Sequence, residues 1–498
     1  MTAVLVGIDI GTSSVKASAI DEKGFLLAKS SHPVDTFIPQ PGWAEQEPVQ
    51  WWEAVCLVIR DITRSISPSR IIAVGLSGQC PGHVLVDADL QPLGRAITWN
   101  DHRAVEEAQW LRENITDSQA EEWVGSTYLG DPSCPPARLL WLNRHRPDAV
   151  KKSISILQPK DFIAMRLTGE IHTDILSAYC LANPQSQKYD PHYFDKLGFP
   201  LEKMPAVLAP AAVAGEVTPM AARQTSLNPS TPVIIGTIDA YCDNLAGGVL
   251  TPGRAVDVAG TSEIVSLAVP SKVTSPDVFT VSLDESSDFL CSPLQSGGNT
   301  LSWLADCFYP EFGHAIRYDL MEQEARSSPP GSSGLVCLPY LDGERAPIWD
   351  PNSRGAFLGI SASHARKDFT RAVYESIAFA IRHTLEVSES AAGFAAADFV
   401  ICGGGSRSHF WNQMKADVLQ RQVIPTADSQ TGCLGAAIIA SVEAGMYPNL
   451  KEACSSMIQF NILVEPDPSK KAVYDKAYHL YRDYYPALKP VWSKVTPV

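Results

Sequence analysis

Two short turns built from glycine and hydroxyl residues are the stretches of this sequence best suited to bind a phosphate group. The first, Gly11-Thr12-Ser13-Ser14, follows Asp9 at the end of an apolar run. Its backbone N–H groups and hydroxyls could hold phosphate oxygens with little bulk in the way, and the Asp9 carboxylate could hold Mg²⁺, usually through water. An ordinary hairpin with a polar turn explains this stretch equally well, because short motifs have many chance matches.

The same pattern occurs again in the second half of the chain, which favours the phosphate-binding interpretation. Residues 254–269 repeat a short strand, a Gly260-Thr261-Ser262 turn and another short strand. Such a repeat predicts two similar lobes that bind one nucleotide. A further strand, 399–402, ends in Gly403-Gly404-Gly405, where a flat ligand could lie against the backbone. The alternative for this last stretch is a tight turn between a strand and a helix.

Side chains able to bind a sugar follow two other predicted strands, because ligands of open α/β sheets bind at strand ends. Strand 71–76 is followed by Gln79 and Cys80, and strand 96–98 is followed by Trp99, Asn100, Asp101 and Arg103. An aromatic face suits sugar C–H groups, and carboxylate and guanidinium groups suit hydroxyls. The competing interpretations are a plain Pro-Gly β-turn after Cys80 and a surface ion pair between Asp101 and Arg103.

A third acidic position follows another predicted strand. Asp239 lies just after the apolar strand 232–236, before the chain enters its second half. An acid at a strand end there can face a cleft between two lobes. Asp243, four residues further on, is a nearby rival for that position.

Hydrophobic periodicity predicts the elements that must position these residues. The apolar run 4–8 predicts a buried strand before Asp9, and 15–20 and 25–29 predict the strands that follow it. An amphipathic helix is predicted over 51–66, and residues 104–230 are predicted to be mostly helical. Near the C-terminus, a small-residue helix from 431 can pack closely on its neighbours. Tyrosines at helical spacing predict the core face of a docking helix: Tyr474, Tyr478, Tyr481 and Tyr485.

Composition limits the classes of partner. The chain has 498 residues, enough for two or three domains, and a formal net charge of −15. That charge disfavours nucleic acid and anionic membranes, which require basic patches, and no apolar stretch is long enough to span a bilayer. The 11 cysteines are scattered, without a metal or disulfide pattern. We therefore expect a cytoplasmic protein, and we expect no signal peptide because Asp9 interrupts the first apolar run.

Longer motifs resemble those of one family. Residues 355–360, 368–369 and 372–375 are similar to the C-terminal signature of the FGGY carbohydrate kinases, in the sugar kinase, heat-shock chaperone and actin superfamily. Residues 138–145 are similar to the N-terminal signature, except that Arg138 stands where the family usually has Lys. Four more stretches are family-like: 41–45, 51–52, 97–103 and 343–347.

This resemblance implies a fold and a division of the chain. The fold would be α/β, with two actin-like (ribonuclease H-like) lobes, each a mixed sheet flanked by helices, and an active-site cleft between them. Residues 1–246 would form the N-terminal sugar-binding and catalytic lobe, and residues 247–498 the C-terminal nucleotide-binding lobe. Nothing in the sequence fixes the oligomeric state, and a homodimer is one option.

The resemblance also implies an ATP-dependent sugar kinase that uses ATP and Mg²⁺, with Asp9 as the metal residue. Nucleotide binding is assigned to eight residues: Gly11, Thr12, Ser13, Gly260, Thr261, Gly298, Gly404 and Gly405. Substrate binding is assigned to Gln79, Cys80, Trp99, Asn100, Asp101 and Arg103. The family base lies about twenty residues before the second phosphate turn. Asp239 keeps this spacing to Gly260 and is preferred over Asp243 as catalytic residue, although Ala240 then replaces the usual Asn.

The substrate expected from the resemblance is a small ketose, with a pentulose such as xylulose first. Xylulokinases carry Gln-Met-His-Gly where this chain has Gln79-Cys80-Pro81-Gly82, so a sugar-contacting His is absent. L-xylulose, ribulose, erythritol and glycerol therefore remain alternatives. A non-catalytic ATP-binding switch on the same core is a more distant alternative, because such proteins lack the sugar-kinase signatures.

Overall fold

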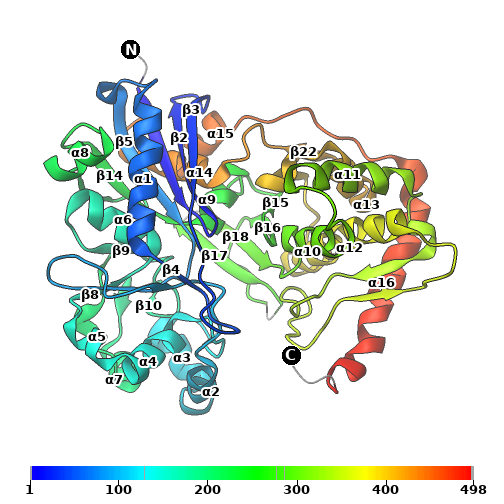
Figure 1. Cartoon of the computed structure of the whole chain (residues 1–498), viewed down its shortest axis with the longest axis horizontal. Helices are drawn as coiled ribbons and strands as arrows, with labels where there is room; N and C mark the ends of the chain where they lie inside the picture. Colours follow the sequence, from blue (N-terminus) through cyan, green and yellow to red (C-terminus); the bar gives the residue numbers. More distant parts are fainter. Residues whose placement is uncertain (1–2, 128, 276, 285–286, 495–498) are drawn as a thin grey trace. The chain divides into compact units, whose positions relative to one another are not determined.

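The computed structural model describes residues 3–127, 129–275, 277–284 and 287–494, which fold into two compact units (Figure 1). Unit 1 comprises Met1–Asp243 and Gly432–Met457, and unit 2 comprises Asn244–Thr431 and Ile458–Val498. The chain thus passes from unit 1 to unit 2 near the expected boundary at 246. It later returns to unit 1 for a segment that the sequence interpretation had assigned to the second lobe.

Unit 1 is built on a mixed sheet, in which some neighbouring strands are parallel and others are antiparallel. Strands β1, β5 and β14 run parallel, whereas β2, β3 and β13 are antiparallel to their neighbours. The order across the sheet is β13 (Val213–Glu216), β14 (Pro232–Ile238), β5 (Ile71–Gly78), β1 (Val4–Ile10), β2 (Ser14–Asp21) and β3 (Leu26–Pro33). The predicted strands 4–8, 15–20, 71–76 and 232–236 are confirmed.

The two faces of this sheet are covered by different helices because side chains alternate along each strand. Val6 and Ile8 of β1 belong to the core that includes Trp51 of α1 (Pro48–Thr63) and Phe162 of α6 (Pro159–Thr168). Gly7, between them, faces the backbone of α14 (Thr431–Glu443) on the other side. The predicted close packing of the helix from 431 is confirmed.

The other elements of unit 1 lie partly in the predicted helical region 104–230 and partly outside it. The further helices of unit 1 are α2 (Val105–Asn114), α3 (Asp117–Val124), α4 (Pro135–His145), α5 (Pro147–Lys152), α7 (Pro191–Leu197), α8 (Pro219–Thr225) and α15 (Leu450–Met457). Its short strand pairs are β4 (Glu45–Gln46) with β7 (Ala96–Ile97), β6 (Val84–Val86) with β8 (Ser155–Leu157), β9 (His172–Asp174) with β12 (Ala206–Leu208), and β10 (Ala182–Asn183) with β11 (Lys188–Tyr189). Helix α9 (Asp239–Ala246) follows β14 at the change of unit.

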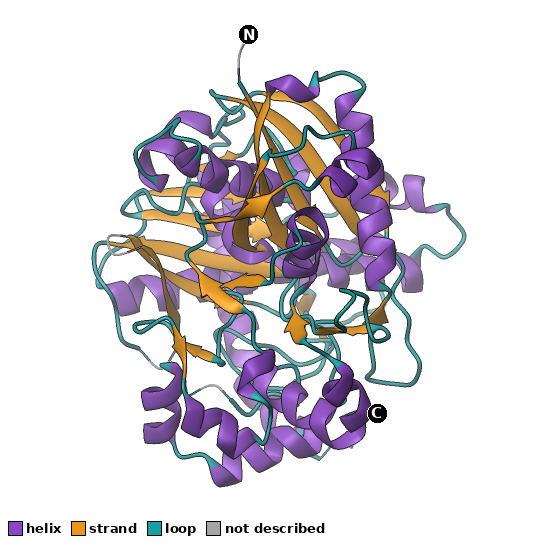
Figure 2. Ribbon diagram, turned by 90° about the vertical axis from the view of Figure 1, so that its left-hand side faces the viewer, coloured by secondary structure: helices purple, strands orange, loops and turns teal. Residues whose placement is uncertain are grey.

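Unit 2 repeats the design of unit 1, whose strands and covering helices face the viewer in Figure 2, with a mixed sheet and helices of its own. The sheet order is β17 (Phe279–Asp284), β18 (Ser287–Pro293), β16 (Glu263–Val269), β15 (Arg254–Ala259), β21 (Asp398–Cys402) and β22 (Val423–Pro425). Its helices are α10 (Gly298–Phe308), α11 (His314–Ser327), α12 (Arg366–Ala392), α13 (His409–Leu419) and α16 (Lys471–Trp492), and β19 (Val336–Leu338) pairs with β20 (Ala356–Leu358). Tyr474, Tyr478 and Tyr481 of α16 are buried in its core, as predicted.

The architecture is therefore the predicted two-lobe α/β fold, with one mixed sheet and flanking helices in each unit. No helix within the described part of the chain combines the length and the apolar character needed to cross a membrane.

A substitution of Gly236 tests how closely β14 packs against β5. It has φ +65°, and a Cβ there would lie 1.6 Å from the carbonyl oxygen of Leu76. We expect Gly236→Ala to lower the free energy of unfolding in urea by about 3 kcal/mol or more, because left-handed strain and overpacking add.

The matched control is Gly169→Ala. Gly169 also has positive φ, at +82°, but a Cβ there meets nothing within 4 Å. It should cost about 1–2 kcal/mol, from backbone strain alone. Equal losses for the two variants would contradict the close approach of β14 to β5.

Candidate active site

Asp9 lies near the carboxyl end of β1 in a tightly enclosed position. Its Oδ1 accepts a hydrogen bond of 3.0 Å from the Ser77 hydroxyl of β5, and its Oδ2 lies 3.9 Å from Lys16 Nζ. Lys16 is directly opposite Asp9 in the β1–β2 register. Gly432 closes the site from α14, since a Cβ there would lie 2.9 Å from Asp9 Cγ. The carboxylate is therefore fixed by three elements.

Two more carboxylates belong to the same cluster. Asp239 is the first residue of α9, and Asp243 follows one turn later, so both side chains lie on one side of the helix. Burial raises the pKa of Asp239 well above its usual value of 3.8, and the nearby charges of Asp9 and Asp243 raise it further. Asp9 in turn raises the pKa of Lys16 against the effect of burial. The arrangement thus concentrates negative charge beside one ammonium group.

Within the described residues, no group of three or more His, Cys, Asp or Glu side chains has a geometry that could hold a metal ion by itself.

The first phosphate turn is held by uncharged groups. Gly11 N–H donates to Ser14 O at 3.1 Å, and Gln46 Nε2 donates to Thr12 O at 2.5 Å. The indole N–H of Trp99 donates to the Thr12 hydroxyl at 2.8 Å. Gln79 is buried, and its amide donates to Gln46 at 2.7 Å and to Gly11 O at 3.4 Å. Two predicted substrate residues, Gln79 and Trp99, therefore contact this turn.

Cys80 lies beyond Gln79, in a turn with a cis peptide bond between Cys80 and Pro81. Its thiol is 3.7 Å from Gln158 Oε1 and 3.9 Å from Ser177 O, distances typical of weak sulfur hydrogen bonds. Burial raises the pKa of the Cys80 thiol well above 9.0, and the charges of Asp174 and Asp239 add to this effect. Cys80 is therefore a neutral thiol in the electrostatic field of Asp239.

Asp101 and Arg103 form an ion pair, but the pair is buried rather than on the surface. Arg103 donates to both Asp101 oxygens, with Nη2 at 2.7 Å from Oδ2, and also reaches Glu45 at 2.9 Å. The guanidinium lies 3.7 Å from the centre of the Trp43 ring. Exposed fractions of 1% for the Arg103 side chain and 0% for Asp101 show that the surface location was wrong. The predicted contacts of a sugar with Asp101 and Arg103 stay predictions. The same holds for the predicted contact of a sugar with Asn100.

In unit 2, the second phosphate turn rests on the N-terminus of α10. Gly298 N–H donates to Gly260 O at 3.1 Å, and Asn299 N–H donates to Thr261 O at 2.8 Å. A Cβ at Gly298 would lie 2.5 Å from Gly260 O, so only glycine allows this contact. Thr261 itself is exposed. The structure thus brings Gly260, Thr261 and Gly298 together, and their binding of a nucleotide stays a prediction.

The triple-glycine turn lies beside the second phosphate turn because β21 and β15 are parallel neighbours. A Cβ at Gly405 would lie 2.7 Å from Ala259 Cβ, whereas Gly404 is exposed. Ser408 then caps α13 by accepting a hydrogen bond of 3.0 Å from Trp411 N–H. A strand, a glycine turn and a helix therefore follow one another here, as both interpretations of this stretch required, and a contact of Gly404 and Gly405 with a nucleotide stays a prediction.

A buried charge cluster lies behind the second turn. Lys415 Nζ of α13 is 2.6 Å from Asp257 Oδ2 and 3.5 Å from Glu263 Oε2, and all three side chains have zero exposure. Burial raises the pKa of Glu263 well above 4.5, and the charge of Asp257 acts in the same direction. The cluster therefore ties both strands of the hairpin to α13.

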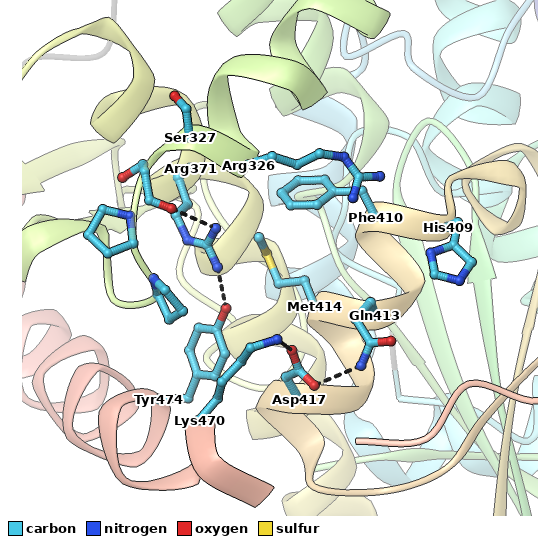
Figure 3. Close-up of a pocket in the computed structure, with 13 residues that line it drawn as sticks. Arg326, Ser327, Arg371, His409, Phe410, Gln413, Met414, Asp417, Lys470 and Tyr474 are labelled. Atoms are coloured by element: carbon cyan, nitrogen blue, oxygen red, sulfur yellow. Dashed lines mark hydrogen bonds and ion pairs between the residues drawn. The ribbon is translucent and has the colours of Figure 1, made fainter. Parts of the chain in front are cut away.

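Unit 2 also contains a cavity of about 550 Å³. Figure 3 shows the side chains that line it. It is lined by parts of α11, α12, α13 and α16. Its polar side chains bond to one another: Arg371 donates to Tyr474, and Lys470 and Gln413 both donate to Asp417. None of the predicted site residues lines this cavity.

Three residues near the predicted site were not foreseen: Lys16, Gln46 and Gly432. Lys16 could have been found, because it is the hairpin residue that must face Asp9 when the turn closes. Gln46 and Gly432 reach the site from distant parts of the sequence, and no local pattern indicates their partners.

Two family models match the chain. The N-terminal domain of the FGGY family of carbohydrate kinases matches residues 4–246, and its C-terminal domain matches residues 255–444. The two-lobe fold is of the actin-like ATPase class. The chain belongs to the FGGY family of carbohydrate kinases and is thus an ATP-dependent sugar kinase.

Similar proteins of known sequence match over nearly the whole length. The chain is 29% identical over 506 residues to a xylulose kinase of Staphylococcus epidermidis, with 99% of each chain covered. It is 30% identical over 496 residues to a probable L-xylulose kinase of Pasteurella multocida, with 97% of this chain and 99% of the relative covered.

Solved structures give the same result. A ligand-bound xylulose kinase from Lactobacillus acidophilus superposes with a TM-score of 0.87 at 26% identity, covering 99% of this chain and 100% of the other. A gluconate kinase from the same organism also reaches 0.87 at 26% identity, with complete coverage of both chains. Similarity of structure therefore does not distinguish these two substrates.

The buried ion pair leads to a stability prediction. Asp101→Asn removes a carboxylate partner from the buried Arg103 guanidinium, and we expect the free energy of unfolding to fall by about 3–5 kcal/mol. Chemical denaturation measures this loss.

Arg64→Gln is the control, because the Arg64 side chain is 79% exposed and pairs with Asp61. An exposed pair contributes about 1 kcal/mol or less. If both variants lowered the free energy of unfolding by the same small amount, the buried ion pair would not stabilise the turn that contains it.

Proposed function

We propose that the enzyme transfers the γ-phosphoryl group of ATP to a hydroxyl of a small ketose, with Asp239 as the general base. The position of Asp239 carries this proposal: it begins α9 at the end of β14, and its carboxylate lies in the field of Asp9 and Asp243. A carboxylate with a raised pKa is better matched to accepting a hydroxyl proton near neutral pH than an ordinary aspartate.

The remaining roles follow from the turns. Backbone N–H groups and the hydroxyls of Thr12, Ser13 and Thr261 would bind the phosphates. Gly404 and Gly405 would lie against the adenosine. Phosphoryl transfer depends mainly on positioning and on neutralising charge, and the ammonium of Lys16 is available for the second task.

The residues around Asp9 fit a magnesium ion. Asp9, Asp239 and Asp243 bring three carboxyl groups close to one ammonium, so this site favours additional positive charge. Asp9 would hold the ion, usually through water. When bound, Mg²⁺ supplies positive charge that neutralises the phosphate oxygens.

We further propose a pentulose such as xylulose as acceptor, because xylulose kinases are among the similar proteins over the full length. Pro81 and Ala240 occupy the positions where xylulokinases carry His and Asn. Each loses a hydrogen-bonding partner for a sugar hydroxyl, and such losses alter which substrate is accepted. L-xylulose, ribulose, erythritol and glycerol are the alternatives, and gluconate joins them through the structural comparison.

A panel of acceptors tests this substrate proposal. We expect a pentulose to be the best acceptor of the panel, and the departures at Pro81 and Ala240 predict a lower kcat/KM for D-xylulose than for another pentulose. Restoring the xylulokinase pattern with Cys80→Met, Pro81→His and Ala240→Asn should raise the value for D-xylulose. The measurement is kcat/KM for D- and L-xylulose, D- and L-ribulose, erythritol, glycerol and gluconate.

Two outcomes would count against it. If unaltered enzyme already prefers D-xylulose by a clear margin, the two departures do not control selectivity. If no member of the panel is phosphorylated while ATP still binds, the acceptor class itself is wrong.

Replacing the proposed base should separate chemistry from binding. Asp239→Asn keeps the side-chain shape but cannot accept the proton, so we expect kcat to fall by about 10²–10⁴-fold. The affinity for ATP, measured by calorimetry, should change little. Asp243→Asn, with the same charge change on the same helix, is the matched control and should retain most activity.

The pH dependence gives an independent check. The base works when deprotonated, so kcat/KM falls as the pH decreases through the raised pKa of Asp239, well above 3.8. Asp243→Asn removes a charge that raises this pKa, and the acidic limb should move to lower pH. If Asp239→Asn remained active and Asp243→Asn did not, Asp243 would be the base.

A further inference from the structure

Arg138 lies on α4, away from the phosphate turns, and is fully buried with 0% exposure. Its guanidinium donates to three main-chain carbonyl oxygens: Pro81 O, Trp99 O and Asp101 O, each at 3.0 Å. Burial lowers the pKa of Arg138, but an arginine remains charged at any physiological pH. These carbonyl dipoles therefore compensate a buried cation, which makes the contacts costly to lose.

The three carbonyls belong to the two turns that carry the proposed sugar-binding residues. Pro81 follows Cys80, Trp99 is itself one of these residues, and Asp101 follows Asn100. The two turns are far apart in sequence, at the ends of β5 and β7. One side chain thus fixes the position of one turn relative to the other.

The second turn is seated on α4 at another point as well. Trp141, one turn after Arg138 on the helix, lies 4.9 Å from the Arg103 guanidinium and 5.5 Å, edge to face, from the Trp43 ring. Trp99 also donates to the Thr12 hydroxyl at 2.8 Å. A shift of this turn would therefore be transmitted to the first phosphate turn.

We propose that Arg138 is a positioning residue that sets sugar selectivity by holding turns 79–82 and 98–101 at a fixed separation. The planar guanidinium spreads its donors over two nitrogens that reach both turns, whereas a lysine would offer three donors from a single point. This inference rests on the proposed acceptor site and adds to it the element that fixes its width.

Arg138→Lys and Arg371→Lys in the full chain test the inference. Arg371 is a matched control in unit 2: it is also buried, and it donates to the carbonyls of Ala325 and Ser328 at 3.1 and 3.0 Å (Figure 3). Both variants should lower the melting temperature. Arg138→Lys alone should speed amide hydrogen exchange in both turns, 79–82 and 98–103.

Kinetics on the same proteins give the functional result. Arg138→Lys should raise the KM for the sugar by about tenfold to a hundredfold, because small displacements of positioning groups have effects of this size. The KM for ATP should stay unchanged, and the ratio of kcat/KM between two sugars should shift. Arg371→Lys should leave that ratio as in the unaltered enzyme.

If Arg138→Lys does not fold, Arg138→Gln replaces it, because a neutral amide needs no charge compensation. Unchanged exchange in either turn, or an unchanged sugar ratio despite lost stability, would overturn the positioning role. Amide hydrogen exchange can be measured without any sugar present. If the unaltered enzyme phosphorylated no sugar but Arg138→Lys still showed faster exchange in both turns, the proposed acceptor would be refuted. The positioning role of Arg138 would then stand without it.

Discussion

The close approach of α14 to the sheet and to α9 is the constraint on which the site in unit 1 depends. A Cβ at Gly7 would lie 1.8 Å from Cys433 O, and one at Gly75 would lie 2.2 Å from Ala436 O. On the helix itself, a Cβ at Gly435 would lie 2.0 Å from Cys242 O of α9. Glycine on both sides of the contact lets backbone meet backbone, so β1, β5 and α9 have one relative arrangement.

The electrostatics of the site follow from this packing. Because Gly432 lies against the Asp9 carboxylate, the start of α14 has no room for a larger side chain there. The same packing holds α9, and with it Asp239 and Asp243, near Asp9. Desolvation and like charge then act together on Asp239. The raised pKa that suits a base is thus a consequence of how tightly a helix packs, rather than of any property of one residue.

The sequence predicted those features of the structure that depend on a few neighbouring residues. Strand β1, its turn and the repeat at Gly260 were predictable because an apolar run and a glycine turn each involve only a few neighbouring residues. The return of Gly432–Met457 to unit 1 was not predictable, since it depends on which glycines face one another across the fold. Likewise, the sequence left open whether Asp101 and Arg103 form a surface ion pair, whereas Trp43 from another segment covers the Arg103 guanidinium.

The two phosphate turns share the sequence Gly-Thr-Ser, but side chains of different kinds support them. Around the first, the neutral amides of Gln46 and Gln79 bond to turn carbonyls. A charged support there would compete with the carboxylate cluster for counter-charge. Behind the second, Lys415 binds Asp257 and Glu263, and the buried cluster has its own cation. The repeat is therefore limited to a Gly-Thr-Ser sequence between two antiparallel strands, and the side chains around the two turns do not repeat.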